Sequence, residues 1–244
     1  FLDFENLVLG FERGRARESF DVQKILGRLV EKGKIIVKKA YCDWSQYEGF
    51  KVALHNSAFE IIDIPKRSHS GKNSADIRLC VDAMDLCYSK EHINTFVILS
   101  GDSDFSPLVS KLKENGKYVI GLATKGAASD LLVDNCDEFI FYEELTERTT
   151  TPPPLGASVP KDKRAAFQLL IDSVQALMRE NKDVIYSSLL KQTMKRKKPA
   201  FSEGRYGYRT FSELLEDAEK KKLISLREDP RSGTYVVSGF GKSG

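Results

Sequence analysis

The chain has 244 residues, of which 41% are hydrophobic and 30% charged, enough to bury one large core or two ordinary ones. No apolar run approaches the roughly 18 to 20 residues that a membrane span needs, and no secretory segment opens the sequence, so we expect a soluble, cytoplasmic protein without a membrane partner. Its four cysteines form no CxxC pair, which favours reduced, buried thiols over disulfides or a thiolate zinc site.

The formal net charge of +3 is unevenly distributed along the chain. Residues 1–160 carry 20 Lys and Arg against 24 Asp and Glu, whereas residues 161–244 carry 18 against 11. A mildly acidic body followed by a basic module is typical of a two-part protein. One part is a catalytic unit that requires cations, and the other binds a polyanion.

Before residue 146, apolar runs of strand length alternate with segments of helical periodicity. Strands are expected at 1–4, 34–44, 59–64, 95–99 and 118–123. Helices are expected at 21–33, 45–58, 74–90 and 104–116, and the segments 127–136 and 138–142 complete the set. This alternation predicts an α/β fold with a parallel sheet covered on both faces by right-handed crossovers.

Residues 146–161, rich in Thr and Pro, are expected to form a semi-rigid linker, because three consecutive prolines fit neither a helix nor a strand ladder. Beyond it, three amphipathic helices (164–180, 186–197, 210–222) precede two strands (223–228, 234–238). Three helices and a hairpin outline a winged helix, a module that often binds nucleic acid. We therefore expect domains at 1–145 and 162–238, and a flexible tail at 239–244.

Four aspartates lie where expected strands end or helices begin. Asp3 ends the first strand, Asp102 and Asp104 follow the strand 95–99, and Asp76 lies in the first turn of a helix that Ser74 is expected to cap. Because the carboxyl ends of parallel strands share one edge of a sheet, these carboxylates should converge there. Without basic partners they would repel one another, so the cluster requires a cation.

The expected cation is Mg²⁺ or Mn²⁺, because the candidate ligands are carboxylates and the side chain of Asn6 rather than Cys or His. Such an ion lowers the pKa of a bound water and stabilises phosphodiester hydrolysis. Gly101 would let the backbone approach the metal closely.

Several of these residues have other interpretations. Asp104 could be the N-cap of the helix that follows it, and Asp76 could serve its helix macrodipole. Asp43, at the end of the second strand, is either a fifth acid near the site or a turn residue. Lys72 and Arg67 lie in a basic loop that leads to Asp76, and this loop either holds the phosphate backbone or is merely solvated. Lys72 is the better candidate.

The stretches "FLDFEN", "SADIRL" and "SGDSDF" together resemble the NYN domain family, a branch of the PIN-like ribonucleases, over roughly residues 1–145. The resemblance implies a doubly wound sheet, an acidic pocket for Mg²⁺ or Mn²⁺, and cleavage of RNA. "AYCDW" also looks like the family's second-strand segment, which implies Asp43 as a supporting member. The catalytic and metal-binding acids that it implies, with their polar supports, are Asp3, Asp76, Asp102, Asp104, Asn6 and Ser100.

Residues 162–238 resemble the LOTUS, or OST-HTH, domain, which implies a winged-helix-like fold that binds RNA or a protein partner. Here basic residues alternate with the rings of Phe201, Tyr206, Tyr208 and Phe211, a composition that suits single-stranded nucleic acid. Phe201 and Phe211 could instead belong to the core. The expected RNA contacts are Lys195, Arg196, Lys197, Lys198, Arg205 and Arg209.

These observations favour a metal-dependent endoribonuclease that acts on single-stranded RNA, with a C-terminal module that raises the local RNA concentration. An RNA-binding regulator with a structural or vestigial metal pocket is the main alternative. A phosphatase of the haloacid dehalogenase type would need a second Asp where Glu5 stands. The choice between RNA and DNA, the cleavage position and the oligomeric state are left open by the sequence.

Overall fold

The computed structural model describes residues 1–13, 20–65, 73–145, 153–155, 159–180, 184–230 and 233–241. The chain divides into two compact units. The first comprises Phe1–Leu26 and Ile35–Glu147, and the second comprises Gly27–Lys34 and Arg148–Gly244. Within these described ranges, the helices are all too short or too polar to cross a lipid bilayer.

The first unit is built on a six-stranded sheet in the order β3-β2-β1-β4-β5-β6, in which every pairing is parallel. Its strands are β1 (Leu2–Asp3), β2 (Lys39–Cys42), β3 (Glu60–Asp63), β4 (Thr95–Leu99), β5 (Tyr118–Ala123) and β6 (Glu138–Phe141). The predicted α/β fold with a parallel sheet is therefore confirmed.

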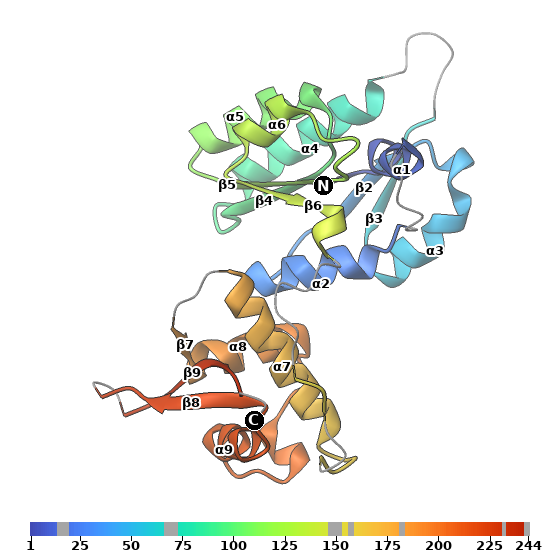
Figure 1. Ribbon diagram of the computed structural model, residues 1–244. Helices are drawn as coiled ribbons and strands as arrows, with labels where there is room; N and C mark the ends of the chain where they lie inside the picture. Colours follow the sequence, from blue (N-terminus) through green and yellow to red (C-terminus); the bar gives the residue numbers. More distant parts are fainter. Residues whose placement is uncertain are drawn as a thin grey trace. The chain divides into compact units, whose positions relative to one another are not determined.

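Helices cover both faces of this sheet. Those of the first part of the chain are α1 (Phe4–Arg13), α2 (Val22–Lys32), α3 (Glu48–Asn56), α4 (Ser74–Ser89), α5 (Ser106–Glu114) and α6 (Asp130–Asn135). The helices α4, α5 and α6 lie side by side on one face, and α3 lies on the other (Figure 1). The direction of winding reverses between β1 and β4, which makes the carboxyl ends of these two strands the topological switch point where open α/β sheets bind ligands.

The structure differs from the sequence predictions in two places near the N-terminus. The first strand ends at Asp3, as expected, but the sequence analysis does not predict the helix α1, which starts at Phe4 and buries Phe4, Leu7 and Val8. The strand expected at 34–44 is limited to Lys39–Cys42, because the residues before it are not paired in the sheet and Ile36 is 53% exposed.

The second unit contains helices and an antiparallel sheet of three strands in the order β7-β9-β8. Its elements are α7 (Arg164–Arg179), β7 (Ile185–Tyr186), α8 (Ser187–Lys197), the 3-10 helix η4 (Glu203–Tyr206), α9 (Phe211–Lys220), β8 (Ile224–Glu228) and β9 (Tyr235–Phe240). The three predicted helices and the predicted hairpin are all present. The strand β9 continues through Phe240, two residues into the expected flexible tail.

The core of the second unit includes residues expected elsewhere. Leu155 and Val159, both in the expected linker, pack against this core. Phe201, Tyr208 and Phe211 are buried in it, which confirms the core interpretation for Phe201 and Phe211 and removes three of the four rings proposed to stack on nucleic acid. Most of the expected linker, residues 146–152 and 156–158, lies outside the described residues.

Candidate active site

The predicted acidic edge begins at the switch point. Asp3 is the last residue of β1, and Ser100 directly follows β4. The Ser100 hydroxyl donates a hydrogen bond to Asp3 Oδ2 at 2.9 Å, joining two segments that are 97 residues apart in the sequence. The sheet therefore brings the ends of these two strands together, as the carboxyl-end argument predicts.

Asp3 is a buried carboxyl group, with 7% of the residue exposed. Its Oδ1 accepts the backbone N–H of Asn6 at 3.3 Å, in addition to the bond from Ser100. Burial raises the pKa of Asp3 to about 7; the Ser100 hydrogen bond opposes this shift, and the charges of Asp76 and Asp102 add to it. The environment of Asp3 therefore favours the protonated acid unless a cation compensates its charge.

Asn6 and Ser100 fix the backbone that follows β4. Asn6 Oδ1 accepts the N–H of Gly101 at 2.8 Å, and the Ser100 hydroxyl accepts the N–H of Asp102 at 3.2 Å. A Cβ atom on Gly101 would lie 2.2 Å from the carbonyl oxygen of Ala127. Gly101 is thus required for close packing against the loop after β5.

Asp76 lies in the first turn of α4, and three other acids act on it. Burial makes the largest contribution to the raised pKa of Asp76. The charges of Asp102, Asp104 and Glu5 raise it further. Ser74 is the first residue of α4 and Asn73 is its N-cap, so the expectation that Ser74 caps this helix is wrong by one residue.

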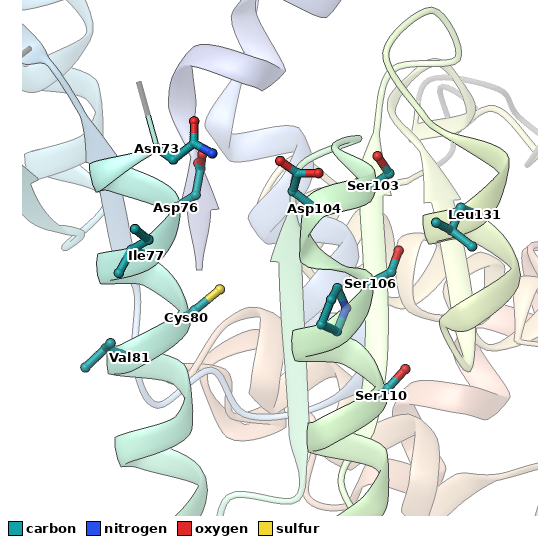
Figure 2. Close-up of a pocket in the computed structure, with 11 residues that line it drawn as sticks. Asn73, Asp76, Ile77, Cys80, Val81, Ser103, Asp104, Ser106, Ser110 and Leu131 are labelled. Atoms are coloured by element: carbon teal, nitrogen blue, oxygen red, sulfur yellow. The ribbon is translucent and has the colours of Figure 1, made fainter. Parts of the chain in front are cut away.

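Asp102 and Asp104 occupy a short turn after β4. Asp102 is the N-cap of the 3-10 helix η2 (Ser103–Phe105), and its Oδ1 accepts the N–H of Asp104 at 2.9 Å. The capping role considered for Asp104 is not present in the structure, because the N-cap of the helix that follows, α5, is Phe105. Asp104 is exposed and lies across from Asp76 (Figure 2).

The donor set fits a hard divalent cation in its chemistry. All candidate ligands are oxygen atoms, and no salt bridge between described residues involves Asp3, Asp76, Asp102 or Asp104. Within the described ranges, however, no group of three or more His, Cys, Asp or Glu side chains is arranged to hold an ion. Coordination would require these carboxylates to move closer together.

Residues 1–143 match the family model of the NYN domain. The chain belongs to the NYN domain family. An uncharacterized protein of Methanocaldococcus jannaschii is 32% identical to it over 136 residues, which cover 55% of this chain and 52% of that protein. The crystal structure of a protein of unknown function from Vibrio parahaemolyticus has the same fold, with a TM-score of 0.52 and 23% identity, and the match covers 59% of this chain and 91% of that chain.

Membership in the NYN family points to a PIN-like nuclease. This assignment concerns the first unit, because the family match ends at residue 143. The resemblance of the C-terminal segment to LOTUS domains stays a prediction. The matched region spans about half the length of the curated relative.

Three other predicted residues of the NYN domain have different outcomes. Asp43 is the N-cap of the 3-10 helix η1 (Trp44–Gln46), and its Oδ1 accepts the backbone N–H and the hydroxyl of Ser45 at 3.2 and 2.6 Å. The turn role considered for Asp43 is therefore present in the structure. Arg67 and Lys72 lie outside the described residues.

The predicted basic contacts of the second unit differ in exposure. Lys195, Lys198, Arg205 and Arg209 are exposed, and Arg196 is half-buried, with its Nη2 donating to Thr193 at 3.0 Å. The exposed side chains are the better candidates for RNA contacts.

Lys197 is engaged within the second unit. Its ammonium donates to Glu31 at 2.7 Å and to the carbonyl of Asp172 at 3.0 Å, and 16% of its side chain is exposed. In this conformation Lys197 is not available to a polyanion, so its predicted RNA contact is contradicted by the pairing seen here.

Glu5 is a site residue that the sequence analysis did not assign. Its charge raises the pKa of Asp76 from a position in α1, two residues after Asp3. A strand over residues 1–4 does not predict this position for Glu5. In the structure the helix α1 begins directly after β1, so Glu5 stays near the carboxyl ends of the strands.

Proposed function

We propose that the protein is a metal-dependent ribonuclease that hydrolyses RNA phosphodiester bonds at the acidic edge of its NYN domain. The observation that carries the proposal is the set of aspartates at the switch point, in which burial and then the charges of neighbouring acids raise the pKa values of Asp3 and Asp76, and in which no aspartate has a basic partner among the described residues. Such an arrangement destabilises the folded protein unless a cation compensates the charges. The cations that carboxylates bind, such as Mg²⁺, usually act on phosphate groups.

In this mechanism each side chain has a separate task. Asp76, Asp102 and Asp104 would supply carboxylate oxygens to a divalent cation at the acidic edge. Ser100 and Asn6 hold Asp3 and the backbone of Gly101 in place through the hydrogen bonds described above. Bound Mg²⁺ or Mn²⁺ would activate a water and neutralise charge on the phosphate. Asp3 would release its proton when the ion binds.

We further propose that the second unit is a winged helix that binds single-stranded RNA. The element order helix, strand, two helices and hairpin, with the sheet order β7-β9-β8, supports this interpretation. The third helix, α9, does not resemble a helix that enters a nucleic-acid groove, because it carries four acidic side chains. All four form hydrogen bonds within the unit. Glu213 accepts from the N–H of Arg209, Glu216 from Tyr235, Asp217 from Tyr208 and Lys221, and Glu219 from the N–H of Leu226.

The exposed basic residues at the end of α8 and in the turn before α9 are therefore the proposed RNA contacts. Replacing Lys195 and Lys198 together by Ala should weaken RNA binding and lower the slope of log K against log salt by about 1.4, the value for two phosphate contacts on a single strand. The matched control is Lys161→Ala with Lys220→Ala, because these lysines are also exposed in the second unit. Equal losses in both double variants would contradict a defined RNA surface.

The test of the ribonuclease is cleavage of 5′-labelled single-stranded RNA and of the matching DNA by the full chain, with Mn²⁺, Mg²⁺ or a chelator. We expect metal-dependent cleavage of RNA that the chelator stops. Binding of RNA without cleavage under all these conditions would overturn the proposal and favour the RNA-binding regulator.

A further inference from the structure

A groove of about 750 Å³ lies between α4 and α5 and opens at the acidic edge. Asp76 and Asp104 line one end of it, and Cys80 points into it from α4 (Figure 2). The groove therefore continues directly from the carboxylates of the candidate active site along the two helices.

Large apolar side chains on this groove are unusually exposed. Ile77 and Val81, one turn apart on α4, are 63% and 58% exposed, and Leu131 on α6 is 58% exposed. An exposed apolar surface of this kind, concentrated in a groove, marks a binding site more often than scattered surface residues do.

The polar groups of the groove restrict what it can hold. Its lining contains no Lys or Arg among the described residues, and the charges at its mouth are those of Asp76 and Asp104, so phosphate groups are disfavoured inside it. Ser106 lines the groove, is 7% exposed, and its hydroxyl has no hydrogen-bond partner among the described residues. Apolar walls with a few hydroxyl groups suit the faces and edges of uncharged heterocycles.

We propose that this groove holds unpaired bases of the RNA strand next to the phosphodiester bond that is cleaved. The inference rests on the proposed ribonuclease function and names the part of the substrate that the site selects. A strand whose phosphate is held at Asp76 and Asp104 through the proposed cation would have its adjacent base beside Ile77 and Cys80, because the same two acids belong to the site and to the groove. A duplex cannot turn its bases into such a groove, so the groove selects single strands.

The first test places a negative charge in the groove. In Val81→Glu the new carboxylate should repel the strand and lower kcat/KM for single-stranded RNA about tenfold, chiefly through KM. Val52→Glu is the matched control, because Val52 is 66% exposed on α3 and does not line the groove. Wild-type kinetics for Val81→Glu would overturn the proposal while leaving the ribonuclease assignment intact.

The second test does not depend on catalysis. Cys80 lines the groove and Cys136 does not, and both thiols are free and half-buried. Alkylation of each cysteine in Asp102→Asn protein is measured by peptide mass spectrometry, with and without a saturating single-stranded RNA. We expect RNA to slow alkylation of Cys80 several-fold and to leave Cys136 unchanged.

Two results would overturn the assignment of the groove to RNA bases. One is an unchanged alkylation rate of Cys80 at saturating RNA. The other is a dimer in light scattering that Val81→Glu dissociates, which would assign the groove to a second copy of the chain. A wild-type protein that cleaves no RNA contradicts the proposed function by itself, whereas protection of Cys80 would still support base binding.

Discussion

Replacing Asp102 by Asn is expected to lower RNA cleavage on the order of a hundredfold or more and to leave RNA binding unchanged. The carboxylate charge of Asp102 acts on both Asp3 and Asp76, and the substitution removes it from the centre of the site. The turn itself should persist, because Asp102 Oδ1 accepts the N–H of Asp104 and an Asn side chain caps helices equally well. The measurements are initial cleavage rates with Mn²⁺ and RNA affinity in a chelator.

The matched control for this variant is Asp21→Asn. Asp21 precedes α2 and accepts the N–H of the residue two positions later, Gln23, at 2.8 Å, which is the same local geometry as at Asp102. It takes no part in the acidic edge, so its replacement should leave cleavage unchanged. Equal loss of binding and cleavage in Asp102→Asn, or cleavage at the wild-type rate, would contradict a metal-dependent site at this turn.

The parts of the site that the sequence predicts are those that follow from strand ends alone. The run 95–99 is apolar, has no helical periodicity and is bounded by polar residues, and the strand β4 has these bounds. Because parallel strands present their carboxyl ends at one edge, Asp3 and Ser100 could be placed at the same edge without knowledge of the strand order, whereas their contact follows from the pairing of β1 with β4.

Other features depend on information that a local pattern does not contain. The helix α1 has Phe4, Leu7, Val8 and Phe11 at helical spacing, but the apolar start of the chain, residues 1–4, favours a strand that overlaps the beginning of this helix. The strand β1 is only two residues long, because Leu2 and Asp3 are the residues that pair with β2, and Leu2 alone pairs with β4. Tertiary pairing rather than propensity decides where this strand ends.

The groove beside α4 could not be predicted for a different reason. The stretch "IRLCVDAM" carries apolar side chains on more than one face of its helix, so the pattern does not tell which of them face the core. In the structure, Leu79 and Ala83 are buried, whereas Ile77 and Val81 remain exposed. An excess of apolar residues around a helix indicates a second apolar surface, and the packing of α5 beside α4 locates it.

Replacing Asp3 by Asn is expected to stabilise the metal-free NYN domain at neutral and alkaline pH. Burial, adjusted by Ser100 and the neighbouring acids, raises the pKa of Asp3 from 3.8 to about 7, so the native state keeps a proton that the unfolded chain releases. Between these two pKa values the native state binds more protons, and the free energy of unfolding therefore falls as pH rises. Above about pH 7 the cost of the buried charge reaches its full size, at most about 4 kcal/mol.

The neutral amide of the Asp3→Asn variant removes this cost, so the variant should gain about 2 to 4 kcal/mol over wild type at pH 8 in a chelator, and nothing near pH 4. Urea unfolding followed by the fluorescence of Trp44, the single tryptophan, reports on the unit that contains Asp3. Asp137→Asn is a control that should lower the free energy of unfolding instead of raising it. The N–H of Val119 lowers the pKa of Asp137, so the ionised Asp137 carboxylate stabilises the native state above its unfolded pKa. Mn²⁺ should stabilise wild type more than Asp3→Asn, since the ion compensates the buried charge. A variant less stable than wild type at pH 8 in chelator would show that Asp3 is already compensated within the protein.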